Sequence, residues 1–238
     1  MALFEINSEG KIMTFFDKLI SCVWVSVLWM FFSIPIFTIG ASTTALYYTV
    51  NKVIRHGRSY VWHEFISSFK ANFKQATGSF LILLGVGIVL GLDTYIMHQM
   101  YLAGEGLGKG YVLFIAFLVM EFCFGMYLFP YMARFDNGFK ATFKNTAIIA
   151  LVNLPKTILM FLILAGCLAL EFMCLYYMPQ AFFVLMLLMP ALSMWWINLI
   201  METVFRKYMS QEDKDTEDDK NGEYPDKVDV FGRPKKRS

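Results

Sequence analysis

The chain has 238 residues, of which 57% are hydrophobic and 17% are charged, and its formal net charge is +2 at pH 7. A soluble domain averages about 45–50% apolar and about 25% charged residues, so this composition excludes an ordinary soluble protein. The net charge by itself says nothing about nucleic acid, because the distribution of charge matters more than its sum, and we expect no nucleic-acid partner. The apolar residues lie in long blocks, which is typical of a chain that crosses a lipid bilayer several times.

Five of these blocks are long enough to be membrane spans. A bilayer core of about 30 Å needs about 20 apolar residues in a helix, and lone strands cannot satisfy their backbone polar groups in lipid. The predicted spans are residues 19–39, 78–98, 111–131, 157–178 and 181–205. The sequence therefore predicts an all-α, five-span transmembrane bundle over residues 1–208. A polar tail from 209 to 238 follows, and its composition is typical of disorder.

Lysine and arginine are distributed unevenly among the predicted loops. The segments after spans one, three and five are basic, whereas the loop after span two holds only Lys109 and the turn after span four holds neither type. Cytoplasmic loops of membrane proteins carry the excess of these residues. We therefore expect a bacterial plasma-membrane protein with its amino terminus outside and its carboxyl terminus in the cytoplasm. If span one turned back at Pro35, the amino terminus would also be cytoplasmic.

A basic-aromatic phrase occurs twice: "FKANFK" begins at Phe69 and "FKATFK" begins at Phe139. On a helix, the spacing of four residues places the rings on one side and the ammonium groups on an adjoining side. We expect rings at the acyl boundary, ammonium groups at anionic head groups, and therefore two cytoplasmic amphipathic elbows. The predicted elbow residues are Phe69, Lys70, Phe73, Lys74, Phe139, Lys140, Phe143 and Lys144.

Each copy of the phrase precedes a pair of predicted spans. This order suggests a parallel internal repeat of residues 65–134 and 135–205, with the first span added in front. The alternative is that similar membrane edges select similar residues independently. A further segment, from Thr43 to Arg55, has an apolar stripe and separate basic residues, which predicts another amphipathic helix along the inner leaflet.

Three acidic residues lie inside predicted spans: Asp93, Glu121 and Glu171. A charge there costs on the order of 3 kcal/mol unless it is paired or neutralised, and no lysine or arginine lies mid-membrane to balance these acids. One explanation is that they are protonated, hydrogen-bonded structural groups. The other is that they converge on a path for a proton, a cation or a polar solute. Glu202, four residues before Arg206, is expected to form an interfacial ion pair with it.

Signatures of enzymes and of metal sites do not occur in the sequence. There is no HExxH, GxSxG or P-loop, and the three histidines are scattered. The four cysteines lie in apolar runs without metal-ligand spacing. We therefore expect no enzymatic activity, no catalytic residue, no metal and no cofactor.

The end of the first predicted span contains a helix-break motif. Pro35 interrupts the last helical turn, and Thr38 can bond a freed carbonyl group. Gly40 permits either a positive φ angle or close packing. These three residues predict a sharp exit into the first elbow. The alternative is that the unwound backbone faces a solute.

The segment from Leu28 to Val53, "LWMFFSIPIFTIGASTTALYYTVNKV", resembles the YesL-like family of bacterial membrane proteins. The matching residues are Trp29, Ser33, Pro35, Thr38, Gly40, Ala45, Leu46, Tyr47 and Tyr48. The later "FKANFKQA" and "NLP" are also similar, so the resemblance extends over roughly residues 10 to 208. It implies a protein of Gram-positive bacteria of the Firmicutes type, encoded near genes for carbohydrate uptake and polysaccharide degradation, with no assigned activity.

Two functions are consistent with these features. The first is a non-enzymatic accessory or regulatory membrane protein that works with components of an ABC-type sugar transporter, as the resemblance implies. The alternative is a small carrier or channel that uses Asp93, Glu121 and Glu171. The sequence leaves the solute, the protein partner and the oligomeric state open.

Overall fold

The computed structural model describes residues 2–55 and 60–209. These residues contain seven α-helices, which confirms the predicted all-α fold. The helices are α1 (Ala2–Ser33), α2 (Ile39–Thr49), α3 (Val61–Leu102), α4 (Tyr111–Arg134), α5 (Phe139–Val152), α6 (Leu154–Tyr177) and α7 (Pro179–Phe205). Three short segments join them: η1 (Ile36–Thr38), η2 (Val50–Arg55) and η3 (Gly106–Gly110). From residue 210 onward, the predicted tail lies outside the described residues.

Five of these helices are long and apolar enough to cross a membrane. They are α1 from Phe16 onward, α3, α4 with its preceding turn, α6 and α7, which confirms the five predicted spans. The ends of α4, α6 and α7 lie close to their predicted positions. Helix α1 ends earlier than predicted, at Ser33, because a proline follows two residues later and the residue before a proline is disfavoured in the helical conformation.

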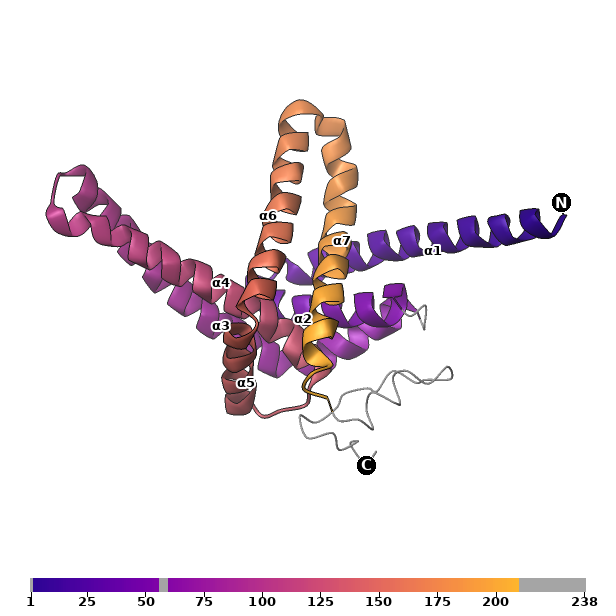
Figure 1. Cartoon of the computed structure of the whole chain (residues 1–238), viewed down its shortest axis with the longest axis horizontal. Helices are drawn as coiled ribbons and strands as arrows, with labels where there is room; N and C mark the ends of the chain where they lie inside the picture. Colours follow the sequence, from indigo (N-terminus) through magenta and orange to yellow (C-terminus); the bar gives the residue numbers. More distant parts are fainter. Residues whose placement is uncertain (1, 56–59, 210–238) are drawn as a thin grey trace.

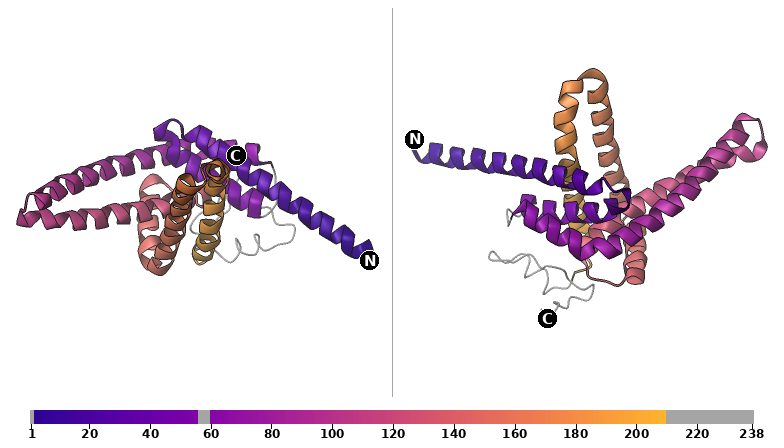
Figure 2. Two further views of the ribbon diagram at one scale, coloured as in Figure 1. Left: turned by 90° about the horizontal axis from the view of Figure 1, so that it is seen from above. Right: turned by 180° about the vertical axis from the view of Figure 1, so that it is seen from behind.

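The long helices leave a common centre as three arms (Figures 1 and 2). One arm is α1, the second is the α3–α4 hairpin, and the third is the α6–α7 hairpin. Each hairpin turns at the end far from the centre. None of the residues in the most apolar 18-residue stretch of α3 is buried in the protein, and 28% are buried in that of α7. The apolar side chains of the arms are therefore mostly not covered by other parts of the protein, whereas the packed core lies where the arms meet.

Helix α2 lies at this centre, which corrects the prediction that Thr43–Arg55 follows the inner leaflet. The segment is helical, as predicted, but all residues from 40 to 54 are buried except Thr43 and Lys52, which are half-buried. Helix α2 contacts α1, α3, α4 and α7. Small residues such as Ala41 and Ala45, both fully buried, let neighbouring helices approach closely. The apolar stripe seen in the sequence is therefore only part of a helix that is buried on all sides.

The two copies of the basic-aromatic phrase occur in different helical contexts. Helix α3 continues through the first copy for 42 residues, which is about 63 Å at 1.5 Å per residue. The second copy begins α5, a separate 14-residue helix that ends at Val152. The prediction treats the first elbow as a separate element. In the structure it is part of a spanning helix, α3. The parallel repeat stays a prediction, although both units contain the phrase and then an antiparallel hairpin.

Candidate functional site

An open groove of about 640 Å³ lies between the α3–α4 and α6–α7 hairpins. All the α-helices except α5 contribute to its walls, so its shape depends on the angle between the arms. The walls are mainly apolar and include Trp29, Leu46, Leu83, Phe122, Leu168 and Met194. A groove of this size and composition fits an apolar segment of a ligand, a lipid or a protein helix.

Two of the three predicted intramembrane acids line this groove: Glu121 of α4 and Glu171 of α6. Asp93 does not belong to its lining. One carboxylate oxygen of Glu121, Oε1, is enclosed and has no hydrogen-bond partner among the described residues. The other oxygen faces Gly87, where a methyl group would lie 3.3 Å from Oε2. The structure therefore brings together two of the acids and separates the third from them.

A second set of charged groups lies at the junction of the arms. The guanidinium Nη2 of Arg134, at the end of α4, lies 3.6 Å from Oε2 of Glu202 on α7, and the two side chains are 1% and 2% exposed. Glu202 Oε1 accepts hydrogen bonds from the Tyr47 hydroxyl at 3.0 Å and from Asn51 Nδ2 at 2.8 Å. A buried ion pair needs such additional bonds to offset the loss of water. This polar junction connects α2, η2, α4 and α7.

The polar junction corrects two interpretations of the sequence. Glu202 is buried against Arg134 rather than exposed at the interface with Arg206, whose side chain is exposed. Arg134 is buried within the protein, so it does not serve as a loop charge that marks a membrane side. One signal for this role was available: Arg134 follows an apolar helical run directly, with no polar loop residue before it. Glu202, 68 positions away (202 − 134), also follows an apolar run, but the sequence does not show that the two residues meet.

The segment η2 is a π-helix that continues α2 and carries Asn51, a fully buried polar residue of the core. A π-helical turn changes the hydrogen-bond register of the backbone, and such turns occur often at functional sites. Near this transition, the main-chain carbonyl of Tyr47 also accepts a hydrogen bond from Asn198 Nδ2 of α7 at 3.3 Å. Asn198 is fully buried. This bond joins α2 to α7 beside the π-helical turn.

A second ion pair joins η2 to the start of α3. Lys52 Nζ lies 3.0 Å from Glu64 Oε2 and 3.2 Å from the Tyr48 hydroxyl, to which it donates. Burial lowers the pKa of the Lys52 ammonium, but the bonds and charges of Glu64 and Tyr48 together outweigh burial, so this pKa is raised overall. Glu64 also lies in the first turn of α3, where the helix dipole favours a negative charge. The pair therefore fixes the start of α3 against the centre.

The helix-break residues have the structural roles that the sequence indicates. Pro35 follows the end of α1, and the Thr38 hydroxyl lies 2.6 Å from the carbonyl oxygens of both Phe32 and Pro35. Gly40 provides close packing rather than a positive φ angle. A methyl group there would lie 2.6 Å from the carbonyl oxygen of Ala76 on α3. The break turns the chain sharply into α2, and of these three residues none lines the groove.

The elbow lysines Lys70, Lys74, Lys140 and Lys144 are exposed, and their position at anionic head groups stays a prediction. Three of the four phenylalanine rings, those of Phe69, Phe73 and Phe143, are half-buried and contact other rings of the protein, and their position at the acyl boundary stays a prediction. Phe69 contacts Phe32 and Phe73, with ring centroids 4.9 and 5.4 Å apart, and Phe143 contacts Phe124 at 5.6 Å. Phe139, the exception, is 40% exposed. The spacing of four residues thus marked a packing face.

Metal ligands do not gather anywhere in residues 2–55 and 60–209. No group of three or more His, Cys, Asp or Glu side chains in this part of the chain is placed to hold a metal ion. The chemistry of the described polar groups is therefore that of ion pairs and hydrogen bonds within the centre, and of two carboxyl groups in an apolar groove.

Five long apolar helices around a small polar centre define an α-helical membrane protein. Residues 22–94 match the model of a family described as "Protein of unknown function, DUF624". The matched residues contain the helix-break motif and the first basic-aromatic phrase, and the match is consistent with the resemblance to the YesL-like family. Neither the curated proteins nor the solved structures contain a match to the chain.

Proposed function

We propose that this chain is a non-enzymatic accessory membrane protein of a bacterial carbohydrate import system. The observation that carries the proposal is the open, mainly apolar groove between the two hairpins. Its exposed wall residues, such as Leu84 and Leu168, belong to helices that are apolar enough to lie in a bilayer. A transmembrane helix of another protein fits between such arms through van der Waals packing.

The carbohydrate part of the proposal comes from the genes that the family resemblance places nearby. The centre of the molecule supports the accessory role, because Arg134 and Glu202 are enclosed and bonded to neighbouring side chains. Such a centre holds the arms at a set angle while leaving their apolar faces for a partner. The basic face at the base of the arms is expected to be cytoplasmic, as the distribution of lysine and arginine predicts.

Site-specific photocrosslinking in the native membrane tests this function. A photoreactive amino acid replaces Leu168, which lines the groove, and in a separate variant replaces Leu170, which is exposed two residues further along α6 and does not line it. Residues two apart on a helix point in different directions. We expect the variant at 168 to crosslink to a membrane subunit of an ABC-type sugar transporter, and the variant at 170 not to do so.

Several outcomes would contradict the accessory function. Crosslinks from position 168 to lipid alone, or only to a second copy of the chain, would remove its support. So would equal crosslinking of a transporter subunit from positions 168 and 170. Unchanged sugar uptake after deletion of the gene would show that a bound transporter does not need the protein.

A small carrier or channel for cations is the second candidate function. The observation that favours it is that Glu121 and Glu171 line the same groove. In proteoliposomes with a pH-sensitive dye inside, Glu121→Gln and Glu171→Gln should each abolish proton flux. Asp93→Asn should retain flux, because Asp93 lies outside the groove lining. If Glu121→Gln and Glu171→Gln carried as much flux as Asp93→Asn at equal protein levels, a path along this groove would be excluded.

A further inference from the structure

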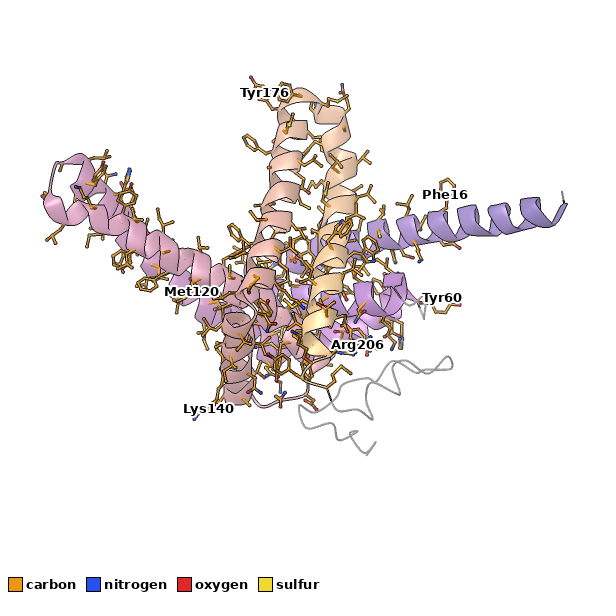
Figure 3. All side chains as sticks on the ribbon, in the orientation of Figure 1. Phe16, Tyr60, Met120, Lys140, Tyr176 and Arg206 are labelled. Carbon is orange, nitrogen blue, oxygen red and sulfur yellow. The ribbon has the colours of Figure 1, made fainter. Side chains whose placement is uncertain are left out.

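Four exposed lysines lie on two helices at the base of the hairpins: Lys70 and Lys74 on α3, and Lys140 and Lys144 on α5. Figure 3 shows Lys140 at the start of α5, at the lower end of that helix. The sequence contains no acidic residue from position 65 to 92, around the first lysine pair, or from 137 to 170, around the second. The positive charge of the lysines is therefore not offset by acidic residues on these stretches of the two helices.

The two lysine pairs flank one contact between α3 and α5. Gln75 Nε2, next to Lys74, donates hydrogen bonds to Thr142 Oγ1 at 2.9 Å and to the Asn137 carbonyl oxygen at 3.1 Å. Thr142 lies between the two lysines of α5. These bonds join α3 to the start of α5 and its preceding loop, so the two lysine pairs lie on either side of one contact.

Exposed apolar side chains follow the lysines at the same distance on both helices. Leu81 and Leu151 each come seven residues after the second lysine of their pair (81 − 74 and 151 − 144), or about 10 Å along a helix. They are 48% and 61% exposed. Basic residues next to exposed apolar residues are typical of the edge of a bilayer. Both helices therefore place the boundary between head groups and acyl chains at an equivalent position, between the second lysine and the leucine.

The nearest other charged groups have different partners or positions. Glu64 forms an ion pair with Lys52. Lys156 of α6 lies within the apolar belt and donates a hydrogen bond to Thr203 Oγ1 at 2.6 Å, so it belongs to the α6–α7 contact. Asp136, just before α5, is half-buried. On residues 65–92 and 137–170, the exposed charged side chains are therefore the four lysines.

We propose that Lys70, Lys74, Lys140 and Lys144 form one binding surface for the phosphate groups of anionic lipids in a single leaflet. Charge complementarity and the adjoining apolar belt both favour a lipid, because a lipid offers a phosphate and acyl chains at the same spacing. The surface binds the base of α3 and α5 to the leaflet and so positions the two hairpins relative to the bilayer. It does not depend on the accessory or carrier function.

Binding of a fluorescent phosphatidylglycerol to the full-length protein in neutral detergent tests this surface. Fluorescence anisotropy gives its Kd, with fluorescent phosphatidylcholine as the uncharged comparison. We expect the wild type to prefer phosphatidylglycerol. Because one basic residue near an anionic surface contributes about fivefold in affinity, K70Q/K74Q/K140Q/K144Q should weaken this binding by at least about twentyfold. The four corresponding arginine substitutions should retain it.

The triple variant K18Q/K109Q/K207Q is the matched control, since it removes exposed lysines at other places. Its Kd should equal that of the wild type, and all variants should have the same size-exclusion profile. Equal Kd values for the wild type and the quadruple glutamine variant would overturn the proposal. An equal loss of phosphatidylglycerol affinity in the triple control variant would also overturn it. So would complete displacement of the lipid by inorganic phosphate at matched ionic strength. A third contrary result would be that a bound protein, and not the lipid, protects the four lysines from chemical modification.

Discussion

The junction of the arms and the arms themselves accommodate charge in opposite ways. At the junction, Arg134 and Glu202 are almost completely buried, and two polar side chains of α2 and η2 bond to the carboxylate. Along the arms, Glu121 and Glu171 face an open groove whose lining contains no lysine or arginine. The comparison shows that the protein surrounds the carboxylate at its centre with a counter-charge and two hydrogen-bond donors, whereas the two carboxyl groups of the arms line a mainly apolar groove.

Removal of the arginine at the junction is expected to have the largest effect on stability. Arg134→Met leaves Glu202 buried without its counter-charge, and breaking a buried pair in this way costs about 3–5 kcal/mol. Thermal unfolding of the purified protein in detergent measures the loss. Lys207→Met, which removes an exposed charge nearby, should change stability by less than about 0.5 kcal/mol.

The double variant Arg134→Met/Glu202→Gln sharpens this result. Glutamine removes the uncompensated charge and still accepts the hydrogen bonds of Tyr47 and Asn51, so most of the lost stability should return. If the double variant were as unstable as Arg134→Met alone, the loss would come from the missing guanidinium volume and not from the buried charge.

A methyl group at Gly40 should have the next largest effect on stability, because it disrupts the packing of α2 against α3 at the centre. The new carbon would lie 2.6 Å from the Ala76 carbonyl oxygen and 2.7 Å from Phe80 Cβ, so α2 and α3 must separate. We expect Gly40→Ala to lower the free energy of unfolding by about 1–3 kcal/mol. Gly91→Ala, on the α3 arm, meets nothing within 4 Å and should be neutral or stabilising. Equal destabilisation by both changes would contradict the difference between centre and arms.

Loss of the hydrogen bonds between α3 and α5 should have the smallest effect of the three. Gln75→Ala removes the bonds to Thr142 and Asn137, which lie where the centre passes into the arms. The expected loss is about 1 kcal/mol in thermal unfolding. Gln99→Ala, at the exposed far end of the same helix, serves as the control. If Gln75→Ala lowered stability as much as Arg134→Met, the tightly packed centre would extend further along the helices than the burial of the side chains indicates.

The doubled phrase shows why similar sequences can have different local structures. At the position 70 residues before Pro155, α3 has Gly85. Glycine keeps its backbone N–H and allows α3 to continue, whereas proline lacks this donor and disfavours a helical residue before it. Helix α5 therefore ends before Pro155, and α6 begins. The residues that cause this difference are visible in the sequence: Pro155 is typical of a helix start, whereas Gly85 is compatible with a continuing helix.

Hydrophobic length alone determined the number and the approximate ends of the long helices, because a helix in lipid needs a minimum run of apolar residues. Local chemistry likewise determined the break at Pro35, whose consequences are limited to neighbouring turns. Only the tertiary structure decided that α2 is buried, that Arg134 meets Glu202, and that two of three acids share a groove. These contacts join residues far apart in the chain, and they depend on the angles at which the arms leave the centre.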